Sequence, residues 1–231
     1  MNRAILTIDD ISSLNTRWMV DYLVEKDIVA VMFARGENVE KFYEEAIYAV
    51  KNGMIVGNHS YSHKAFSELS LKEAIEEIEK CEKVLDKLYK DAGVQRKYRP
   101  FRFPYGNKGG ENRAQIQKYL RENGFSKLDD RAISYPWWRE NGANEDIDTF
   151  WTFDFEEYRI SWNDGFTRES SLMKMDDPNP QNGGPLFGEN IANIILTHAH
   201  DETEAVWPKY LKEMVERAIA GGVTFVKPEF I

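Results

Sequence analysis

Short apolar runs alternate with amphipathic segments along the chain, and this alternation limits the folds that the sequence can adopt. Apolar runs typical of buried strands lie at residues 3–8, 28–33 and 54–56. Segments with the apolar spacing of helices lie between them, at residues 15–26 and 38–51. Near-continuous apolar strands joined by helices are typical of a parallel sheet covered on both faces. We therefore expect an α/β fold.

The same alternation continues to the end of the chain. A capping box, Ser70-Leu-Lys-Glu73, predicts a long helix that ends near residue 90. We predict further strands at residues 98–103, 125–128, 149–154, 193–197 and 223–226, and further helices at residues 111–122 and 204–220. About seven such units in a single domain favour a barrel over an open sheet. Residues 132–148 and 161–189 lack periodicity and are expected to form long loops, which are often functional.

The composition excludes several classes of protein. The chain has 231 residues, a formal net charge of -9 and a pI near 5.1, which argues against nucleic acid or an anionic membrane as a partner. The N-terminus lacks the long apolar stretch of a signal peptide, and no run approaches the roughly 18 apolar residues of a membrane span. We therefore expect a soluble, cytoplasmic protein; the alternative is an exported parent protein with a trimmed N-terminus. Cys81, the only cysteine, has the spacing of a core residue.

Polar residues follow the predicted strands, where parallel α/β folds gather their functional groups. The candidates at these strand ends are Asp9, Asp10, His59, His63, Arg102, Tyr105, Asp154, His198 and His200. This set contains all four histidines of the chain. We expect these side chains to meet at one rim of the fold.

His59 and His63 are four residues apart, a spacing that can direct two imidazoles at one ion. Asp9 or Asp10 would complete a set of two histidines and one aspartate, which suits zinc and other divalent metals. Because adjacent side chains diverge, one aspartate could bind the ion while the other acts as a base. The alternatives are two ordinary surface histidines and an aspartate pair that caps a helix.

Three further positions are open to two interpretations each. His198 ends an apolar strand, where it could act as a general acid or base or form a structural hydrogen bond. His200 is less informative and could simply face solvent. Trp137 and Trp138 follow a proline in a loop, where they could stack on sugar rings or pack in the core.

Taken in order, the strand-end motifs resemble those of the polysaccharide deacetylase family, also called carbohydrate esterase family 4. The motifs are T-I-D-D, H-S-Y-S-H, R-F-P-Y-G, W-T-F-D-F-E-E-Y and I-L-T-H. The resemblance covers nearly the whole chain and implies a distorted (β/α)7-type barrel. It also implies a divalent metal, with zinc expected first and cobalt, nickel or manganese as alternatives.

The resemblance implies a role for each matching residue. Asp10, His59 and His63 would bind the metal, and Asp9, held by Arg102, would be the base. The N–H of Tyr105 would stabilise the oxyanion, and His198, tethered by Asp154, would be the acid. Leu196 and Tyr158 would line a pocket for the acetyl methyl group.

Several positions depart from the usual family pattern. Ile11-Ser12 stand where Gly-Pro is common, and Phe103 replaces a frequent proline. The fourth motif, usually D-x-x-D-W, has Glu157 and Tyr158 at its last two positions. These changes remove no expected metal ligand and neither of the expected proton-transfer residues, but they put the shape of the cleft in question.

We therefore predict a metal-dependent hydrolase that removes N-acetyl groups from a chitin-like or peptidoglycan-like sugar. One alternative is an amidohydrolase of the same superfamily that acts on a small cyclic amide or imide, as allantoinases do. The other is a carbohydrate-binding protein without catalytic activity, which would lack a base, an acid or a metal ligand.

Overall fold

The first strand, β1 (Asn2–Ile11), lies at the centre of the sheet and has three neighbours. In the computed structural model, which describes residues 2–231, β1 pairs in parallel with β2 (Val31–Ala34), β5 (Ala192–His198) and β6 (Val223–Phe225). The register between β1 and β5 places Asp9 beside His198. Two candidate site residues thus become neighbours through backbone pairing alone.

The remaining strands extend the sheet on both sides of β1. β3 (Ile55–Asn58) pairs with β2, and β4 (Phe153–Asp154) pairs with β5, which gives the order β3-β2-β1-β5-β4. Every one of these pairings is parallel, as the apolar strand pattern predicts.

Isolated backbone contacts close the sheet into a barrel. Asn58 forms a parallel bridge with Phe101, and the Phe101 carbonyl accepts a hydrogen bond of 2.8 Å from the Thr149 N–H. Thr152 N–H then donates to the Ile194 carbonyl of β5 at 2.9 Å. The distorted barrel is therefore confirmed, but the strands expected at residues 98–103 and 125–128 are reduced to single bridges.

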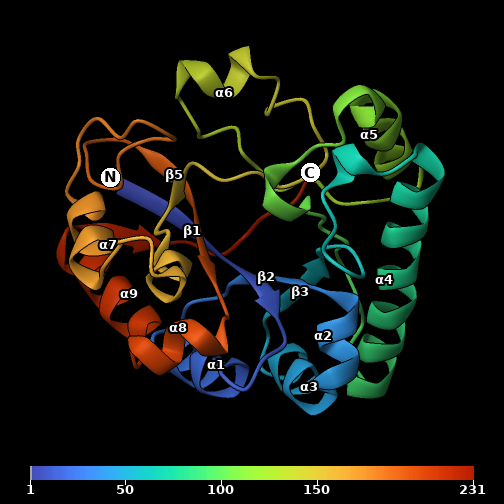
Figure 1. Ribbon diagram of the computed structural model, residues 1–231, viewed down its shortest axis with the longest axis horizontal. Coiled ribbons are helices and arrows are strands. Elements are labelled where there is room, and N and C mark those ends of the chain that lie inside the picture. The colour runs from blue at the N-terminus through green and yellow to red at the C-terminus, as the bar shows by residue number, and fades with distance from the viewer. Residues whose placement is uncertain (1) are drawn as a thin grey trace.

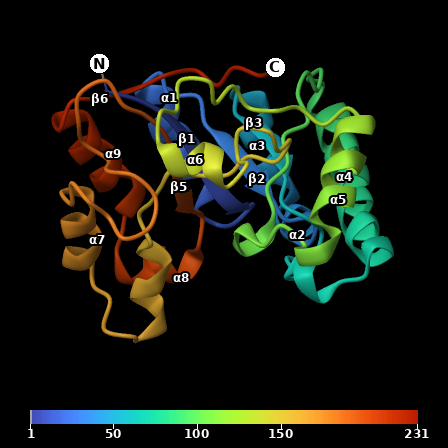
Figure 2. The ribbon, with the colours of Figure 1, turned by 90° about the horizontal axis from the view of Figure 1, so that it is seen from above.

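Helices surround this barrel (Figure 1), and Figure 2 shows α7, α8 and α9 on one side of the sheet and α4 and α5 on the other. The α-helices are α1 (Thr16–Glu25), α2 (Gly36–Lys41), α3 (Tyr43–Lys51), α4 (Leu71–Ala92), α5 (Arg113–Glu122), α6 (Pro136–Glu140), α7 (Arg168–Met175), α8 (Asp201–Val206) and α9 (Tyr210–Ala220). The 3-10 helices are η1 (Phe66–Glu68), η2 (Pro104–Gly106), η3 (Gly110–Asn112) and η4 (Glu157–Trp162). Within residues 2–231, no helix is long and apolar enough to cross a membrane.

Two predicted helices are interrupted, and both predicted long loops contain a helix. The helix expected at residues 38–51 breaks at Phe42. The one expected at residues 204–220 breaks at Trp207, because the proline that follows disfavours helical backbone at that residue. α6 lies within the first expected loop and α7 within the second.

The long helix α4 packs against the barrel through an apolar stripe and supports the end of β3. Cys81 is fully buried in this stripe, and burial raises the pKa of its thiol, which agrees with the predicted core role. At the next position, the buried carboxylate of Glu82 accepts hydrogen bonds from Asn58 at 2.9 Å and from Arg96 at 2.8 Å and 3.0 Å. Arg99 Nε adds a further bond of 2.9 Å. This cluster fixes Asn58, the residue that precedes His59.

Replacing Glu82 should destabilise the fold. Burial tends to raise the pKa of Glu82, but the charge and hydrogen bonds of Arg96, with those of Asn58 and Arg99, lower it overall. The ion pair therefore stabilises the protein above the unfolded-state pKa, and this stability is lost as pH falls through the lower folded-state pKa. We expect Glu82→Gln to lower the free energy of unfolding by about 3 kcal/mol in urea denaturation at pH 7.

Glu76→Gln is the matched control for Glu82→Gln, because Glu76 lies on the same helix but its side chain is 60% exposed. We expect the control to leave the free energy of unfolding unchanged. Equal effects of the two variants would contradict a structural role for the buried cluster.

Candidate active site

A cleft of about 350 Å³ lies at the carboxyl ends of the strands, where the sequence predicts the site. Its lining includes most of the candidate residues: Asp9, Asp10, His59, His63, Tyr105, Asp154, Tyr158, Leu196, His198 and His200. A larger cavity of about 680 Å³ lies around the amino ends of β1 and β5, but its lining contains no histidine. All four histidines of the chain are therefore gathered in the smaller cleft.

A β-bulge brings both aspartates into this cleft. The register between β1 and β2 pairs Asp9 with Phe33 and Ile11 with Ala34, so that Asp10 is an extra residue. Asp10 has a φ of 63°. In a regular strand the two side chains would point to opposite faces, whereas a bulge redirects one of them. The expected divergence of Asp9 and Asp10 is thus wrong, and both carboxylates face His59.

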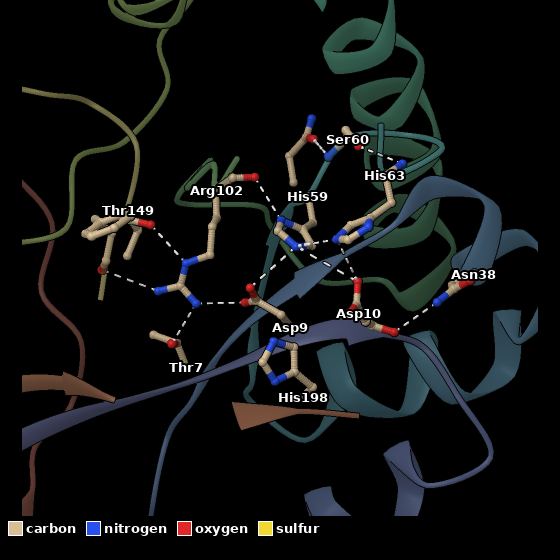
Figure 3. A network of polar contacts seen from close by, with 12 residues as sticks. Thr7, Asp9, Asp10, Asn38, His59, Ser60, His63, Arg102, Thr149 and His198 are labelled. Carbon is tan, nitrogen blue, oxygen red and sulfur yellow. Dashed lines mark hydrogen bonds and ion pairs between the residues drawn. The ribbon is translucent and has the colours of Figure 1, made fainter. Parts of the chain in front are cut away.

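The imidazoles of His59 and His63 face each other across the cleft (Figure 3). Their Nε2 atoms are 3.2 Å apart, and His59 Nδ1 lies 2.8 Å from the Arg102 carbonyl. Because a carbonyl can only accept, Nδ1 of His59 carries the hydrogen of this contact, which leaves Nε2 as the nitrogen available to a metal. Burial lowers the pKa of His63 to about 4, so this imidazole is neutral at pH 7. Nε2 of His59 and Nε2 of His63 are therefore the nitrogens placed to bind a metal together.

Asp10 completes a set of donors that fits a divalent ion. Its Oδ1 is buried, receives no hydrogen bond from residues 2–231, and lies 3.4 Å from His63 Nε2 and 3.9 Å from His59 Nε2. Burial tends to raise the pKa of Asp10, but a hydrogen bond from His200 and the nearby imidazoles hold it well below its usual range. One carboxylate and two neutral imidazoles suit zinc and similar divalent ions.

Arg102 holds the second carboxylate in place. It is 1% exposed, and its Nη1 donates to Asp9 Oδ1 at 2.7 Å and to Thr7 Oγ1 at 2.8 Å. Its Nε donates to the Thr149 carbonyl at 2.9 Å. Figure 3 shows the guanidinium between Thr149, Thr7 and Asp9. One oxygen of Asp9 is thus fixed by Arg102, while Oδ2 lies 3.4 Å from His59 Nε2.

The carboxylate that contacts His198 is Glu157, not Asp154 as the sequence predicted. Glu157 is fully buried, and its Oε1 lies 3.1 Å from His198 Nδ1 while also accepting the His198 N–H at 2.7 Å. Asp154 is close, but its Oδ1 accepts the N–H of Glu156. The D-x-x-D-W pattern has two acidic positions, and Glu157 matches the second, so the motif itself held this signal.

Electrostatics favour a protonated His198. Burial tends to lower its pKa, but the hydrogen bond and charge of Glu157, with the charges of Asp154 and Asp9, raise it to about 10. Burial raises the pKa of Asp154 to about 6. Asp154, Glu157 and His198 also lie close enough together to bind an ion. An imidazolium has no lone pair for a metal, however, so this group suits proton donation better.

Strained backbone is concentrated around the cleft. Three non-glycine residues of its lining, Asp10, His63 and Tyr105, and the buried neighbour Ser60 have φ between 58° and 64°. Such conformations cost on the order of 1–3 kcal/mol each and persist where surrounding bonds enforce them. Here Asn58 Oδ1 accepts the Ser60 N–H at 2.8 Å, and Asn38 Nδ2 donates to the Asp10 carbonyl at 2.9 Å. The placement of this strain is typical of a functional site.

The aromatic residues that face the cleft differ from those expected. Trp138 is 2% exposed, and Trp137 packs against the same core cluster, so both are core residues rather than parts of the cleft. Trp162 lines the cleft instead, is 63% exposed and contacts Tyr158 edge to face at a centroid distance of 5.0 Å. Leu196 lies in the lining, as predicted.

His200, whose role the sequence left open, lies in the cleft with the other three histidines. Its Nε2 is 2.7 Å from Asp10 Oδ2. The sequence holds no motif for this contact, because His200 and Asp10 are brought together by the pairing of β5 with β1.

Comparison with known proteins agrees with this geometry. The sequence profile of the polysaccharide deacetylase family matches residues 2–126, which is more than half of the chain. The chain belongs to the polysaccharide deacetylase family. The matched segment of this family member contains the candidate metal ligands, Asp9 and Arg102, but ends before the residues around His198.

Two curated relatives are peptidoglycan deacetylases of bacilli. The peptidoglycan-N-acetylmuramic acid deacetylase PdaC of Bacillus subtilis (strain 168) is 35% identical over 115 residues, which is 48% of this chain and 23% of that protein. The peptidoglycan-N-acetylglucosamine deacetylase of Bacillus cereus (strain ATCC 14579) is 35% identical over 102 residues, 44% of this chain and 35% of that protein. The family member described here thus spans well under half the length of either relative.

Solved structures extend the likeness to the whole fold. The Bc1960 peptidoglycan N-acetylglucosamine deacetylase matches with a TM-score of 0.67 at 23% identity, over 97% of this chain and 85% of that one. BA3943 of Bacillus anthracis, described as a pseudoenzyme, matches with a TM-score of 0.63 at 19% identity, over 97% of this chain and 64% of that one. At these identities the likeness establishes the fold alone, and the chemistry depends on the residues in the cleft.

The Glu157 contact can be tested by titrating His198. Glu157→Gln removes the negative charge that raises the pKa of His198, so the imidazolium should lose its proton at a lower pH. A charge-assisted hydrogen bond is worth about 1.5–3 kcal/mol, so we expect a fall of about 1–2 pH units in an NMR titration of the metal-free protein.

Asp154→Asn is the companion variant. It should lower the pKa of His198 by less than Glu157→Gln does, because the charge of Asp154 acts on His198 without a direct hydrogen bond. A larger effect of Asp154→Asn than of Glu157→Gln would restore the original prediction for Asp154.

Proposed function

We propose that residues 1–231 form the catalytic domain of a metal-dependent deacetylase that removes N-acetyl groups from a sugar polymer of the peptidoglycan type. The proposal rests on the arrangement of a metal-binding set, a carboxylate base and a histidine acid in one cleft. The Asp10, His59 and His63 donors lie beside the carboxylate of Asp9, and His198, which favours the protonated form, is paired with Asp9 across β1 and β5. Figure 3 draws His198 on the side of Asp9 away from the two imidazoles.

Asp10, His59 and His63 would hold the metal, with zinc as the expected ion and cobalt, nickel or manganese as substitutes. When bound, such an ion supplies a Lewis acid that polarises the amide carbonyl and makes water more acidic. Asp9 Oδ2 would take the proton from the attacking water. Arg102 keeps Asp9 oriented, because its Nη1 donates a hydrogen bond to Oδ1 from a fully buried position.

His198 would complete the reaction by protonating the departing nitrogen. An amine leaves poorly as an anion, so bond cleavage needs an acid on the side of the leaving group. The hydrogen bond that His198 Nδ1 donates to Glu157 favours the protonated imidazole and fixes its orientation. Net proton flow therefore runs from water through Asp9 on one side and from His198 to the sugar amine on the other.

The walls of the cleft would accommodate the acetyl group and the sugar. Leu196 is 2% exposed and offers a small apolar surface for the methyl group, with the ring of Tyr158 beside it. We assign the backbone N–H of Tyr105 to the oxyanion. The exposed indole of Trp162 offers a face on which a sugar ring can stack.

The complete set of groups argues against a protein that only binds carbohydrate. Such a protein would be expected to lack a ligand, the base or the acid, and the chain has all of them. Both curated relatives carry names of peptidoglycan deacetylases, which favours an acetylated sugar over a small cyclic amide.

The decisive experiment measures acetate release by the zinc-loaded protein from peptidoglycan fragments and from N-acetylglucosamine oligomers. We expect one acetate and one free amine per reaction, and loss of activity with a chelator. A cyclic imide serves as the contrasting substrate. Ring opening of the imide without acetate release from any acetylated sugar would contradict the proposal.

Asp9→Asn tests the assigned base. The amide cannot accept the proton from water, so we expect kcat to fall by about 100-fold or more. Metal content, measured by mass spectrometry of the bound ion, should remain near one per chain, whereas His59→Ala should lose the ion. Unchanged turnover of Asp9→Asn would remove Asp9 from the mechanism.

Trp162→Ala tests the sugar-stacking surface. A stacking contact of about 0.5–1.5 kcal/mol predicts a rise in KM of about 2–10-fold for an oligosaccharide, with little change in kcat. Met173→Ala is the control, since Met173 is also exposed and lies in the same segment, residues 161–189, but outside the cleft. The same KM for both variants would exclude Trp162 from sugar binding.

A further inference from the structure

The two carboxylate oxygens of Asp10 face different partners. Oδ1 points toward the imidazoles, 3.4 Å from His63 Nε2 and 3.9 Å from His59 Nε2. Oδ2 lies 2.7 Å from His200 Nε2, a normal hydrogen-bond distance. Only one oxygen of Asp10 is therefore free to bind an ion together with the two histidines.

His200 is held in position by its backbone rather than by its ring. Its carbonyl accepts a hydrogen bond of 3.0 Å from Asn15 Nδ2 and one of 3.2 Å from the Glu204 N–H, which starts α8. Asn15 is itself buried. The ring of His200 lies 5.1 Å from that of His198, and its side chain is 30% exposed to the cleft. The imidazole can therefore reach Asp10 without being locked in the core.

The chemistry of the contact identifies His200 as a donor. His200 Nε2 lies 2.7 Å from Asp10 Oδ2, and an aspartate that binds a metal does so as a carboxylate, which only accepts hydrogen bonds. Nε2 of His200 must therefore carry the hydrogen, and it has no lone pair to offer a metal in this arrangement. His200 is also absent from the group of donor atoms that lie within 4.8 Å of one another.

We infer that His200 is a positioning residue for the metal site: it occupies Oδ2 of Asp10 and thereby restricts this carboxylate to binding the ion through Oδ1 alone. The inference rests on the metal site of the proposed function. Groups that hydrogen-bond to metal ligands orient them, and their loss typically weakens metal binding by about 10–100-fold. Restricting Asp10 to one oxygen also leaves a coordination position for water or substrate.

The test compares zinc affinity in four proteins by competition with a chromophoric chelator. We expect His200→Ala to raise the zinc Kd by about 10–100-fold relative to the unmodified chain. His200→Gln can place an amide N–H near the position of Nε2 and should restore most of the affinity. Val206→Ala, an exposed change on α8 outside the cleft, should leave the Kd unchanged.

A spectroscopic measurement separates positioning from general loosening of the site. In the cobalt-substituted protein, freeing Oδ2 in His200→Ala should let Asp10 bind through both oxygens, which raises the coordination number and weakens the visible absorption. His200→Gln should keep the original spectrum. A merely structural role for His200 would lower thermal stability without changing this spectrum.

The zinc affinities and cobalt spectra together separate a failure of the His200 role from a failure of the proposed metal site. Equal Kd values and equal cobalt spectra for His200→Ala and the unmodified chain would overturn it while leaving the proposed function intact. If the unmodified chain itself bound no metal, the proposed function would fail first, and this inference with it. Should His200→Ala not fold, His200→Leu keeps the bulk without the donor, and the same Kd for His200→Leu and His200→Gln would equally refute the role.

Discussion

The buried ion pair between Arg102 and Asp9 is the interaction on which both the barrel and the site depend. The guanidinium lies inside the barrel, where it binds Thr7 and Asp9 of β1 and the carbonyl of Thr149 on the far side. Two buried charges are costly unless they are paired and fully bonded, and loss of one partner would leave the other uncompensated. The same contact that closes the irregular part of the barrel thus orients the proposed base. Arg102 therefore contributes both to the stability of the fold and to the proposed chemistry.

Much of the site could be predicted from the position of polar residues after apolar strands. Parallel pairing forces the carboxyl ends of β1, β3 and β5 to one rim, so that Asp9, His59 and His198 meet without any special feature. The bulge at Asp10 could not be predicted in this way, because two adjacent aspartates in a regular strand point apart. Only the extra residue and its positive φ place both carboxylates in one cleft.

Some residues were given the wrong role from the sequence, or their role was left open. Contacts between segments that lie far apart in the chain place these residues. Glu157 replaces Asp154 as the partner of His198, since the turn after β4 directs the later carboxylate inward. Trp137 and Trp138 pack in the core, and the exposed indole comes from Trp162 in a region that lacks apolar periodicity. His200 contacts Asp10 across 190 residues. Spacing along a chain carries no information about such pairs until the strand order is known.

The proposed metal ligands and the proposed acid come from different parts of the chain. Every proposed metal ligand lies before residue 64, within the segment that matches the family profile, whereas the proposed acid and its carboxylates lie after residue 153. Metal capture and proton delivery could therefore change independently during evolution, and a chain could retain its ion while losing turnover. His200 links the two segments, because it lies in the later one and contacts Asp10, a proposed metal ligand in the earlier one. A substitution just after β5 can thus act on Asp10, a proposed metal ligand on the opening strand.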